Sequence, residues 1–239
     1  MPPPEPADRP RRFYATASVG PLESGWGVLL DGRAARPPSG GRLILPTEAL
    51  AALLAEEWAG QGETIDMAGM AATRLAFAAV DRVAGARAQT AAEVGRYASS
   101  DLLCYFADQP EALIARQTQR WGPLLDWARE ALDLHFERAV GIIHRPQPPE
   151  TIAKVEALAL ALDDFSLAGL AFAAGLFGSA ILALALQRDQ LDGAAAFDLS
   201  RLDEEFQEEK WGVDAEAAAR RAHLAAEAAM LDRWFQTLR

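Results

Sequence analysis

Residues 26–33 read Trp-Gly-Val-Leu-Leu-Asp-Gly-Arg, and this stretch decides the fold class of the N-terminal part of the chain. An apolar run ends at Asp31-Gly32, and Gly tolerates the positive φ angle that a two-residue hairpin turn requires. Aromatic and small residues from Phe13 to Val19 precede the run, and Arg42 to Leu45 reads as another short strand after a loop rich in Pro and Gly. The pattern predicts a small antiparallel sheet.

A helix is predicted directly after this sheet. Thr47 is placed to accept a backbone N–H bond as the N-cap, and Glu48 lies in the first turn, where the helix dipole favours an acid. Apolar residues then recur at helical spacing, which indicates that the helix packs against the sheet. They are Leu50, Leu53, Leu54 and Trp58. Gly60 and Gly62 are expected to end the helix.

From Thr73 onward, periodic apolar residues predict helices almost to the C-terminus. Pro123 suits the first turn of a helix, where a missing N–H costs nothing. In the last helix Leu224, Ala228, Leu231, Phe235 and Leu238 share one stripe, which another helix must cover. The predicted helices span residues 73–83, 87–99, 111–121, 123–132, 150–162, 165–177, 179–190, 194–210 and 214–238.

The predicted fold class is therefore α+β. A small antiparallel β-rich N-terminal domain is expected at residues 13–72, followed by a larger, mostly α-helical domain at residues 73–239. Residues 1–12 are rich in Pro and Arg and lack the apolar segment of a secretory signal, so we expect a flexible tail. The run Arg-Pro-Gln-Pro-Pro at residues 145–149 does not suit a helix interior and is predicted to be a linker.

The uncharged segment from Phe165 to Leu186 is long enough to cross a bilayer as one helix. More than half of it is Ala, Gly or Ser, and no basic cluster or Trp/Tyr belt flanks it. Gly178-Ser179 in its middle is typical of a helix stop followed by the N-cap of the next helix. Two short buried helices are therefore favoured over a membrane span.

Composition and charge exclude several classes of function. The net charge of -11 argues against a general nucleic-acid-binding protein, because such proteins neutralise phosphates with clustered Lys and Arg. Cys104 is the only cysteine, which rules out an internal disulfide and a multi-cysteine metal site and favours a reducing compartment. In its apolar surroundings Cys104 reads as a small buried hydrophobe more than as a nucleophile.

The usual motifs of enzymes and cofactor sites are missing from the sequence. Gly25-Trp26-Gly27 begins like a dinucleotide fingerprint, but Leu30 stands where the third Gly belongs. The chain has neither a phosphate-binding loop ending in Gly-Lys-Ser/Thr nor a Gly-x-Ser-x-Gly elbow. The histidines His135, His144 and His223 are isolated, so no zinc pair is formed. We predict no catalytic residue, no metal and no cofactor.

The acidic stretch at residues 203–209 contains five carboxylates around Phe206 and Gln207. In one helix, Glu204 and Glu208 are expected opposite the core, with Asp203 and Glu209 beside its edge. The apolar face is formed by Ala195, Leu199, Leu202 and Phe206. Solvated charge is the default interpretation, since a carboxylate pair for acid/base chemistry needs a partner and a pocket.

Several stretches together resemble, in order and spacing, the family of ATP12-type assembly chaperones that act on the F(1) sector of ATP synthase. The resemblance runs from Phe13 nearly to the C-terminus, with Met70-Ala71-Ala72-Thr73 and Phe106 as departures from the family pattern. The matching stretches are residues 12–14, 30–33, 45–47, 57–61, 97–105, 116–117, 121–127, 178–179, 201–207 and 211–212.

The resemblance implies a binding protein without enzymatic activity. It implies a β-rich part and a larger helical part that bind the unassembled alpha subunit of the catalytic head without ATP, with no nucleic acid, membrane insertion or small-molecule substrate. Family members in eukaryotes reside in the mitochondrial matrix, and for this chain the missing targeting segment predicts a bacterial cytoplasmic protein. The alternative is a small soluble enzyme, such as a hydrolase, with an unrecognised site.

The partner-binding surface is expected on the C-terminal helices, where the family resemblance coincides with acids that the core does not require. The expected contact residues are Glu204, Glu205, Gln207, Trp211, Gly212, Asp214 and Glu216. Trp211 and Gly212 could instead only close a helix, because helix-end glycines are commonly caps. Likewise, Trp58 could be a core residue.

Overall fold

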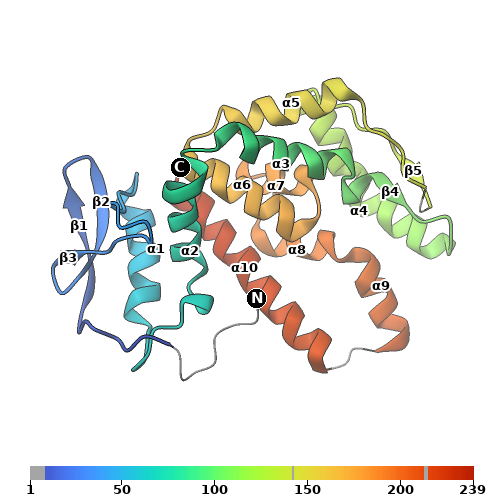
Figure 1. The fold of residues 1–239 in the computed structure, drawn as a ribbon. Coiled ribbons are helices and arrows are strands. Elements are labelled where there is room, and N and C mark those ends of the chain that lie inside the picture. The colour runs from blue at the N-terminus through green and yellow to red at the C-terminus, as the bar shows by residue number, and fades with distance from the viewer. Residues whose placement is uncertain (1–8, 142, 213–214) are drawn as a thin grey trace. The chain divides into compact units, whose positions relative to one another are not determined.

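A computed structural model describes residues 9–141, 143–212 and 215–239 of the chain. Two compact units are present: the first comprises the chain up to Ala86 together with Arg233–Arg239, and the second comprises Arg87–Asp232. A small antiparallel sheet is followed by mostly helical structure, which confirms the predicted α+β class (Figure 1). The domain limits at residues 13–72 and 73–239 stay a prediction about which parts fold independently.

The sheet of the first unit has the strand order β1 (Ala17–Leu22), β2 (Gly25–Leu30) and β3 (Arg33–Ala34), all antiparallel. Asp31 and Gly32 join β2 to β3 with φ angles of 47° and 80°, respectively. Positive φ at both central residues is the geometry of a tight hairpin turn. The hairpin predicted from the sequence is confirmed.

Two other strand predictions were wrong in extent. The first strand begins at Ala17, because the residues before it bind a side chain and not a neighbouring strand: the Asp31 carboxylate accepts the N–H groups of Ala15 (3.0 Å) and Thr16 (2.8 Å). The segment Arg42 to Leu45 contributes only an isolated bridge between Leu45 and Trp26. The sheet is thus smaller than the apolar pattern indicates.

Of the predicted tail, residues 1–8 lie outside the described residues. The part that follows them is hydrogen-bonded to a later segment of the same unit. Arg11 forms an antiparallel bridge with Thr64, and the guanidinium of Arg9 lies 3.0 Å from the carboxylate of Asp66.

Helix α1 (Glu48–Ala59) covers the sheet, as Figure 1 shows, and contacts both β1 and β2. The Thr47 hydroxyl accepts the N–H of Leu50 at 3.0 Å, which confirms the predicted N-cap, and donates to the carbonyl of Thr237 at 2.7 Å. The predicted apolar stripe is buried, and Gly60 is the C-cap. Helix α1 therefore forms the core of this unit together with the sheet.

The 3-10 turn η2 (Met67–Gly69) leads into helix α2 (Ala71–Ala78), which continues as a π-helical turn, η3 (Ala79–Val83). The helix predicted at residues 73–83 begins earlier because the Glu57 carboxylate accepts the N–H groups of Ala72 and Thr73, each at 2.8 Å. A side chain of α1 thus takes the place of a local cap.

In its described residues, the regular structure of the second unit is helical apart from one pair of very short strands. In Figure 1 helix α3 lies beside α5 and α6, which it contacts. The strands β4 and β5 pair in parallel, with Tyr105 opposite Ala139, a pairing that the sequence pattern does not predict. The elements are α3 (Arg87–Ser99), η4 (Leu102–Cys104), β4 (Tyr105–Phe106), α4 (Glu111–Leu132), β5 (Ala139–Val140), α5 (Pro149–Leu160), α6 (Asp164–Phe177), α7 (Ala180–Gln187), α8 (Gly193–Ser200), α9 (Leu202–Trp211) and α10 (Ala215–Thr237).

The uncharged segment forms two helices, α6 and α7, as predicted. Gly178 ends α6 in the left-handed conformation, with φ 64°, and the Ser179 hydroxyl accepts the N–H of Leu182 at 3.0 Å. Among the residues that the structure describes, no helix is both long and apolar enough to span a bilayer.

The predicted break at Pro123 was wrong, because α4 is continuous and contains this proline. A proline inside a helix costs about 3 kcal/mol. The buried face of α4 runs past it on both sides, through Leu113, Trp121 and Ala128. Packing along this face outweighs the local preference of proline for a helix start.

The helix predicted at residues 194–210 was also wrong, because it is divided at Arg201 into α8 and α9. In a continuous helix the carbonyl of Leu199 would accept the N–H four residues later. Here that carbonyl accepts the indole N–H of Trp121 at 3.0 Å. A long-range hydrogen bond from α4 thus coincides with the break, which no local sequence signal announces.

Candidate partner-binding surface

Helix α9 is anchored to the second unit by its apolar residues. Leu202 and Phe206 are buried, and two cations cover the ring of Phe206: the Arg116 guanidinium at 5.1 Å and the Lys210 ammonium at 4.2 Å from its centroid. Arg116 also forms a two-pronged ion pair with Glu209, at 2.6 and 2.9 Å. These contacts hold α9 against α4.

Asp203 is the carboxylate of this stretch that is tied to the core. The Gln117 side chain donates to it at 2.8 Å and accepts the N–H of Ala107 at 2.8 Å. Burial raises the pKa of Asp203, although the hydrogen bond from Gln117 opposes the shift. The prediction that Asp203 lies beside the edge of the core is confirmed, and the residue has a structural role.

Ion pairs connect α9 with the first half of α10. Arg221 lies 2.6 Å from Glu205 and 3.0 Å from Glu208, and Arg201 lies 3.3 Å from Glu208. The prediction that Glu208 faces away from the core was wrong, since its side chain is only 17% exposed. Two guanidinium groups neutralise it there. We call α9 together with residues 215–227 of α10 the α9–α10 arm.

The structure separates the predicted contact residues into two groups. Glu204, Gln207 and Trp211 are exposed and spaced so that they share one face of α9, and the Trp211 side chain is 83% exposed. Glu205 instead faces Arg221 inside the arm. The exposed group is available to a partner, and the paired group stabilises the arm.

The other predicted residues lie at the junction of the two helices. Gly212 ends α9 with φ 80°, so it has the cap role that was the simpler interpretation. Glu216 is exposed in the first turn of α10, where the helix dipole favours an acid. Asp214 lies outside the described residues. Trp58 is buried in α1 and stacks edge-on with Tyr14, so it is a core residue.

The arginines of the arm were missed by sequence reasoning. Arg201 pairs with acids of α9 itself, whereas the pairing of Arg221 with Glu205 and Glu208 depends on how α10 folds back along α9. The spacings of Arg201 from Glu204 (three residues) and from Glu208 (seven residues) were signals that could have revealed part of the network.

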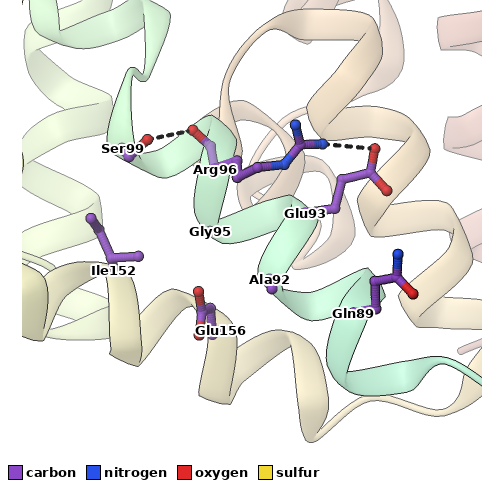
Figure 2. Close-up of a pocket in the computed structure, with 8 residues that line it drawn as sticks. All are labelled: Gln89, Ala92, Glu93, Gly95, Arg96, Ser99, Ile152 and Glu156. Carbon is purple, nitrogen blue, oxygen red and sulfur yellow. Dashed lines mark hydrogen bonds and ion pairs between the residues drawn. The ribbon is translucent and has the colours of Figure 1, made fainter.

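A shallow groove of about 470 Å³ lies between α3 and α5, as shown in Figure 2. A side chain at Gly95 would meet the carboxylate of Glu156, so the glycine allows this side chain to lie across α3. Glu93 and Arg96 pair with each other at 3.2 Å along one edge. No titratable groups converge on one point in the groove, so its arrangement suits close helix packing more than chemistry.

A buried polar cluster joins η4 to the start of α7. The Asp101 carboxylate accepts the Ser179 hydroxyl (2.7 Å), the N–H of Leu103 (3.1 Å) and the N–H of Ile181 (3.0 Å). Burial raises the pKa of Asp101 to about 6 and also raises the pKa of the neighbouring Cys104 thiol. Both side chains are 0% exposed, so no substrate reaches them. The cluster is structural.

Across residues 9–141, 143–212 and 215–239, no group of three or more His, Cys, Asp or Glu side chains is arranged to hold a metal ion. Of the acids of α9, Glu205, Glu208 and Glu209 are paired with arginines, Asp203 accepts a hydrogen bond from Gln117, and Glu204 is exposed. The arrangement is thus suited to contact with another macromolecule through charge and an exposed indole.

Comparisons with known proteins agree with a binding role. The profile of the family described as ATP12 chaperone protein matches residues 11–129. Atp12 from Paracoccus denitrificans and a point mutant of the same protein are each 43% identical to this chain, with TM-scores of 0.88; both cover 96% of this chain, and 99% and 98% of their own chains are matched. A candidate chaperone from Agrobacterium tumefaciens is 39% identical, with a TM-score of 0.89 and coverage of 96% of this chain and 87% of its own.

Proposed function

Because the chain belongs to the ATP12 chaperone family, we propose that it is an assembly chaperone of ATP synthase that binds the free alpha subunit of the catalytic head. The single observation that carries this proposal for the structure is the exposed face of α9. There Trp211, which is 83% exposed, shares one face of the helix with Glu204 and Gln207. Packing of the core does not require polar residues at these positions.

The physical reason for such a protein lies in its client. A subunit destined for a ring exposes apolar interface before its neighbours arrive, and exposed apolar surface aggregates unless it is covered. Tryptophan is enriched among the residues that dominate binding energy at protein interfaces. A complementary surface is sufficient for this task, and the proposal requires no catalytic residue and no ATP.

The proposed contact residues are those of the arm that remain accessible: Glu204, Gln207, Trp211 and Glu216. Glu205 supports the surface by fixing α10 through Arg221. Gly212 acts in the proposal through the turn that it allows, and Asp214 stays a proposed contact by its position in the sequence. As its compartment we propose the bacterial cytoplasm.

A pull-down with purified free alpha subunit tests the proposal. The wild-type chain should retain the subunit without ATP, and the variant Trp211→Ala should retain about tenfold less at equal concentration, as for an interface hot spot. Glu204→Lys should also weaken capture. The matched control is Glu63→Lys, which makes the same charge change at an exposed position of the first unit. Failure of the wild-type chain to retain the subunit would contradict the proposal and would favour the alternative of a small hydrolase.

A further inference from the structure

A hollow of about 510 Å³ lies within the second unit, where the α9–α10 arm faces the ends of α6 and α8. Its volume is in the range of sites that enclose a small ligand or a large side chain. Its walls are polar and apolar to similar extents. On the apolar side, Phe177 and Phe197 are largely buried, whereas Leu224 of α10 is only half-buried. The apolar lining includes Leu102, Phe177, Phe197 and Leu224.

Two arginines, Arg201 and Arg220, bring positive charge to this hollow. Arg220 lines it, is exposed and forms no ion pair with any residue that the structure describes, in contrast to its neighbour Arg221. Arg201 also lines it, and the buried Nε–H of Arg201 has no acceptor among the described residues. Buried donors are almost always paired in native proteins, so this wall has unused capacity for an acceptor.

One acid, Glu204, lies on the same lining, but it does not neutralise these groups. Its carboxylate is 3.9 Å from Arg201, at the limit of an ion pair, and its side chain is 55% exposed. The guanidinium of Arg201 is directed mainly to Glu208, at 3.3 Å. A second carboxylate can therefore enter beside Arg220 without displacing an existing strong pair.

We propose that this hollow receives an apolar side chain of the free alpha subunit together with an adjacent acidic residue, which pairs with Arg220. This inference rests on the proposed function and adds to it the chemistry of the client segment. The apolar side chain covers Leu224 and the phenylalanine wall, and the acid lies at the mouth. Charge complementarity selects the occupant, because an apolar segment flanked by a base would meet Arg220 unfavourably.

The inference gives the binding surface an alternating charge pattern. Glu204 and Arg220, which carry opposite charges, both line the hollow, and Glu216 is exposed on the same helix as Arg220. A client that matches this order has one favoured register, since a shifted segment would place like charges opposite each other. The alternation therefore supplies specificity in addition to affinity.

The test is a calorimetric titration of purified free alpha subunit into the full chain and its variants, at low salt and at about 0.5 M salt. Arg220→Glu should weaken binding about tenfold at low salt and reduce the dependence on salt, as expected for a lost charge pair. Leu224→Asp should weaken binding by a similar factor at both salt concentrations, because it places a charge against the apolar group. Arg120→Glu, on an exposed position of α4 without a described ion pair, is the matched control and should bind as the wild type does.

The outcomes separate this inference from the proposed function. If the wild-type chain binds and both variants bind as tightly as it does, the hollow is not the docking site, while the chaperone function stands. If the wild-type chain does not bind the subunit, both proposals fail. Circular dichroism and the thermal midpoint check the fold, and should Leu224→Asp fail to fold, Arg220→Glu decides alone, since its side chain is exposed.

Discussion

Helices α6 and α7 and the α9–α10 arm belong to the same unit but are stabilised in different ways. Nearly all side chains of α7 are buried, and a fully buried carboxylate, Asp101, binds its first turn. The arm has two buried residues in α9, and the first half of α10 is mostly exposed. Ion pairs of Glu205 and Glu208 with Arg221 hold it together.

The difference indicates where stability and binding reside. Buried apolar area contributes about 25 cal/mol per Å², whereas partly exposed ion pairs contribute about 1 kcal/mol or less. Regions with few buried contacts open most readily and are the ones that proteins use for binding. The comparison therefore predicts that substitutions in α7 act on unfolding and that substitutions in the arm act on client capture.

The largest effect is expected for Leu182→Ala in α7. Leu182 is 0% exposed, so the substitution should lower the free energy of unfolding by about 3–5 kcal/mol through lost burial and a residual cavity. Urea unfolding followed by circular dichroism measures the change. Leu160→Ala, at a position that is 41% exposed, is the control and should cost about 1 kcal/mol or less. Equal losses in the two variants would refute the assignment of stability to α7.

The next effect concerns Asp101 and pH. Because burial raises its pKa from 3.8 to about 6, the folded state holds this proton more tightly than the unfolded state does. The stabilisation by the proton is complete below about pH 4 and is lost as pH rises through about 6, a change of about 2–3 kcal/mol. Urea unfolding of the wild type and of Asp101→Asn at several pH values isolates this contribution. The free energy of unfolding of the wild type should fall relative to that of Asp101→Asn as pH rises from about 4 to above about 6. A difference between the two free energies that stays constant with pH would contradict the assignment.

A smaller effect is expected for Arg221→Met, which keeps the aliphatic part of the side chain and removes both ion pairs. The free energy of unfolding should fall by about 1 kcal/mol. Hydrogen exchange of the backbone amides in residues 215–224 should accelerate while that of α7 stays unchanged. Arg233→Met, which removes the exposed pair with Glu56, is the control for loss of an arginine from α10. Faster exchange in α7 as well would mean that the arm and the core open together.

The smallest effect on stability is expected for Trp211→Ala. Because Trp211 is 83% exposed, the substitution should change the free energy of unfolding by less than about 0.5 kcal/mol, although it weakens client capture. Thermal unfolding and the pull-down on the same preparation give both quantities. Destabilisation comparable to that of Leu182→Ala would show that the indole is a packing residue.

Local signals predicted much of the fold. Asp31-Gly32 specified the hairpin, Thr47 the start of α1 and Gly178-Ser179 the break between α6 and α7, because turn and cap residues act on their own backbone. The same signals failed where distant residues decide. Pro123 stayed inside α4, and α8 ends at the carbonyl that Trp121 binds from 78 positions away.

The candidate surface was predictable in its acids but not in their arrangement. Helical spacing placed Glu204 outward, yet it also placed Glu208 outward, because the pattern holds no information on which other helix lies alongside. The hollow behind α9 has no sequence signature at all. Its lining comes from segments as far apart as Ser100 and Leu224, which only the tertiary fold brings together.

The single thiol of the chain is useful beyond its role in packing. Cys104 is fully enclosed, and burial raises its pKa, so a maleimide or disulfide reagent meets an unreactive group as long as the second unit stays closed. The rate at which Cys104 is labelled therefore reports how often the helical core opens. No cysteine has to be introduced or removed for that measurement, and adding the client to the reaction would report whether capture slows the opening.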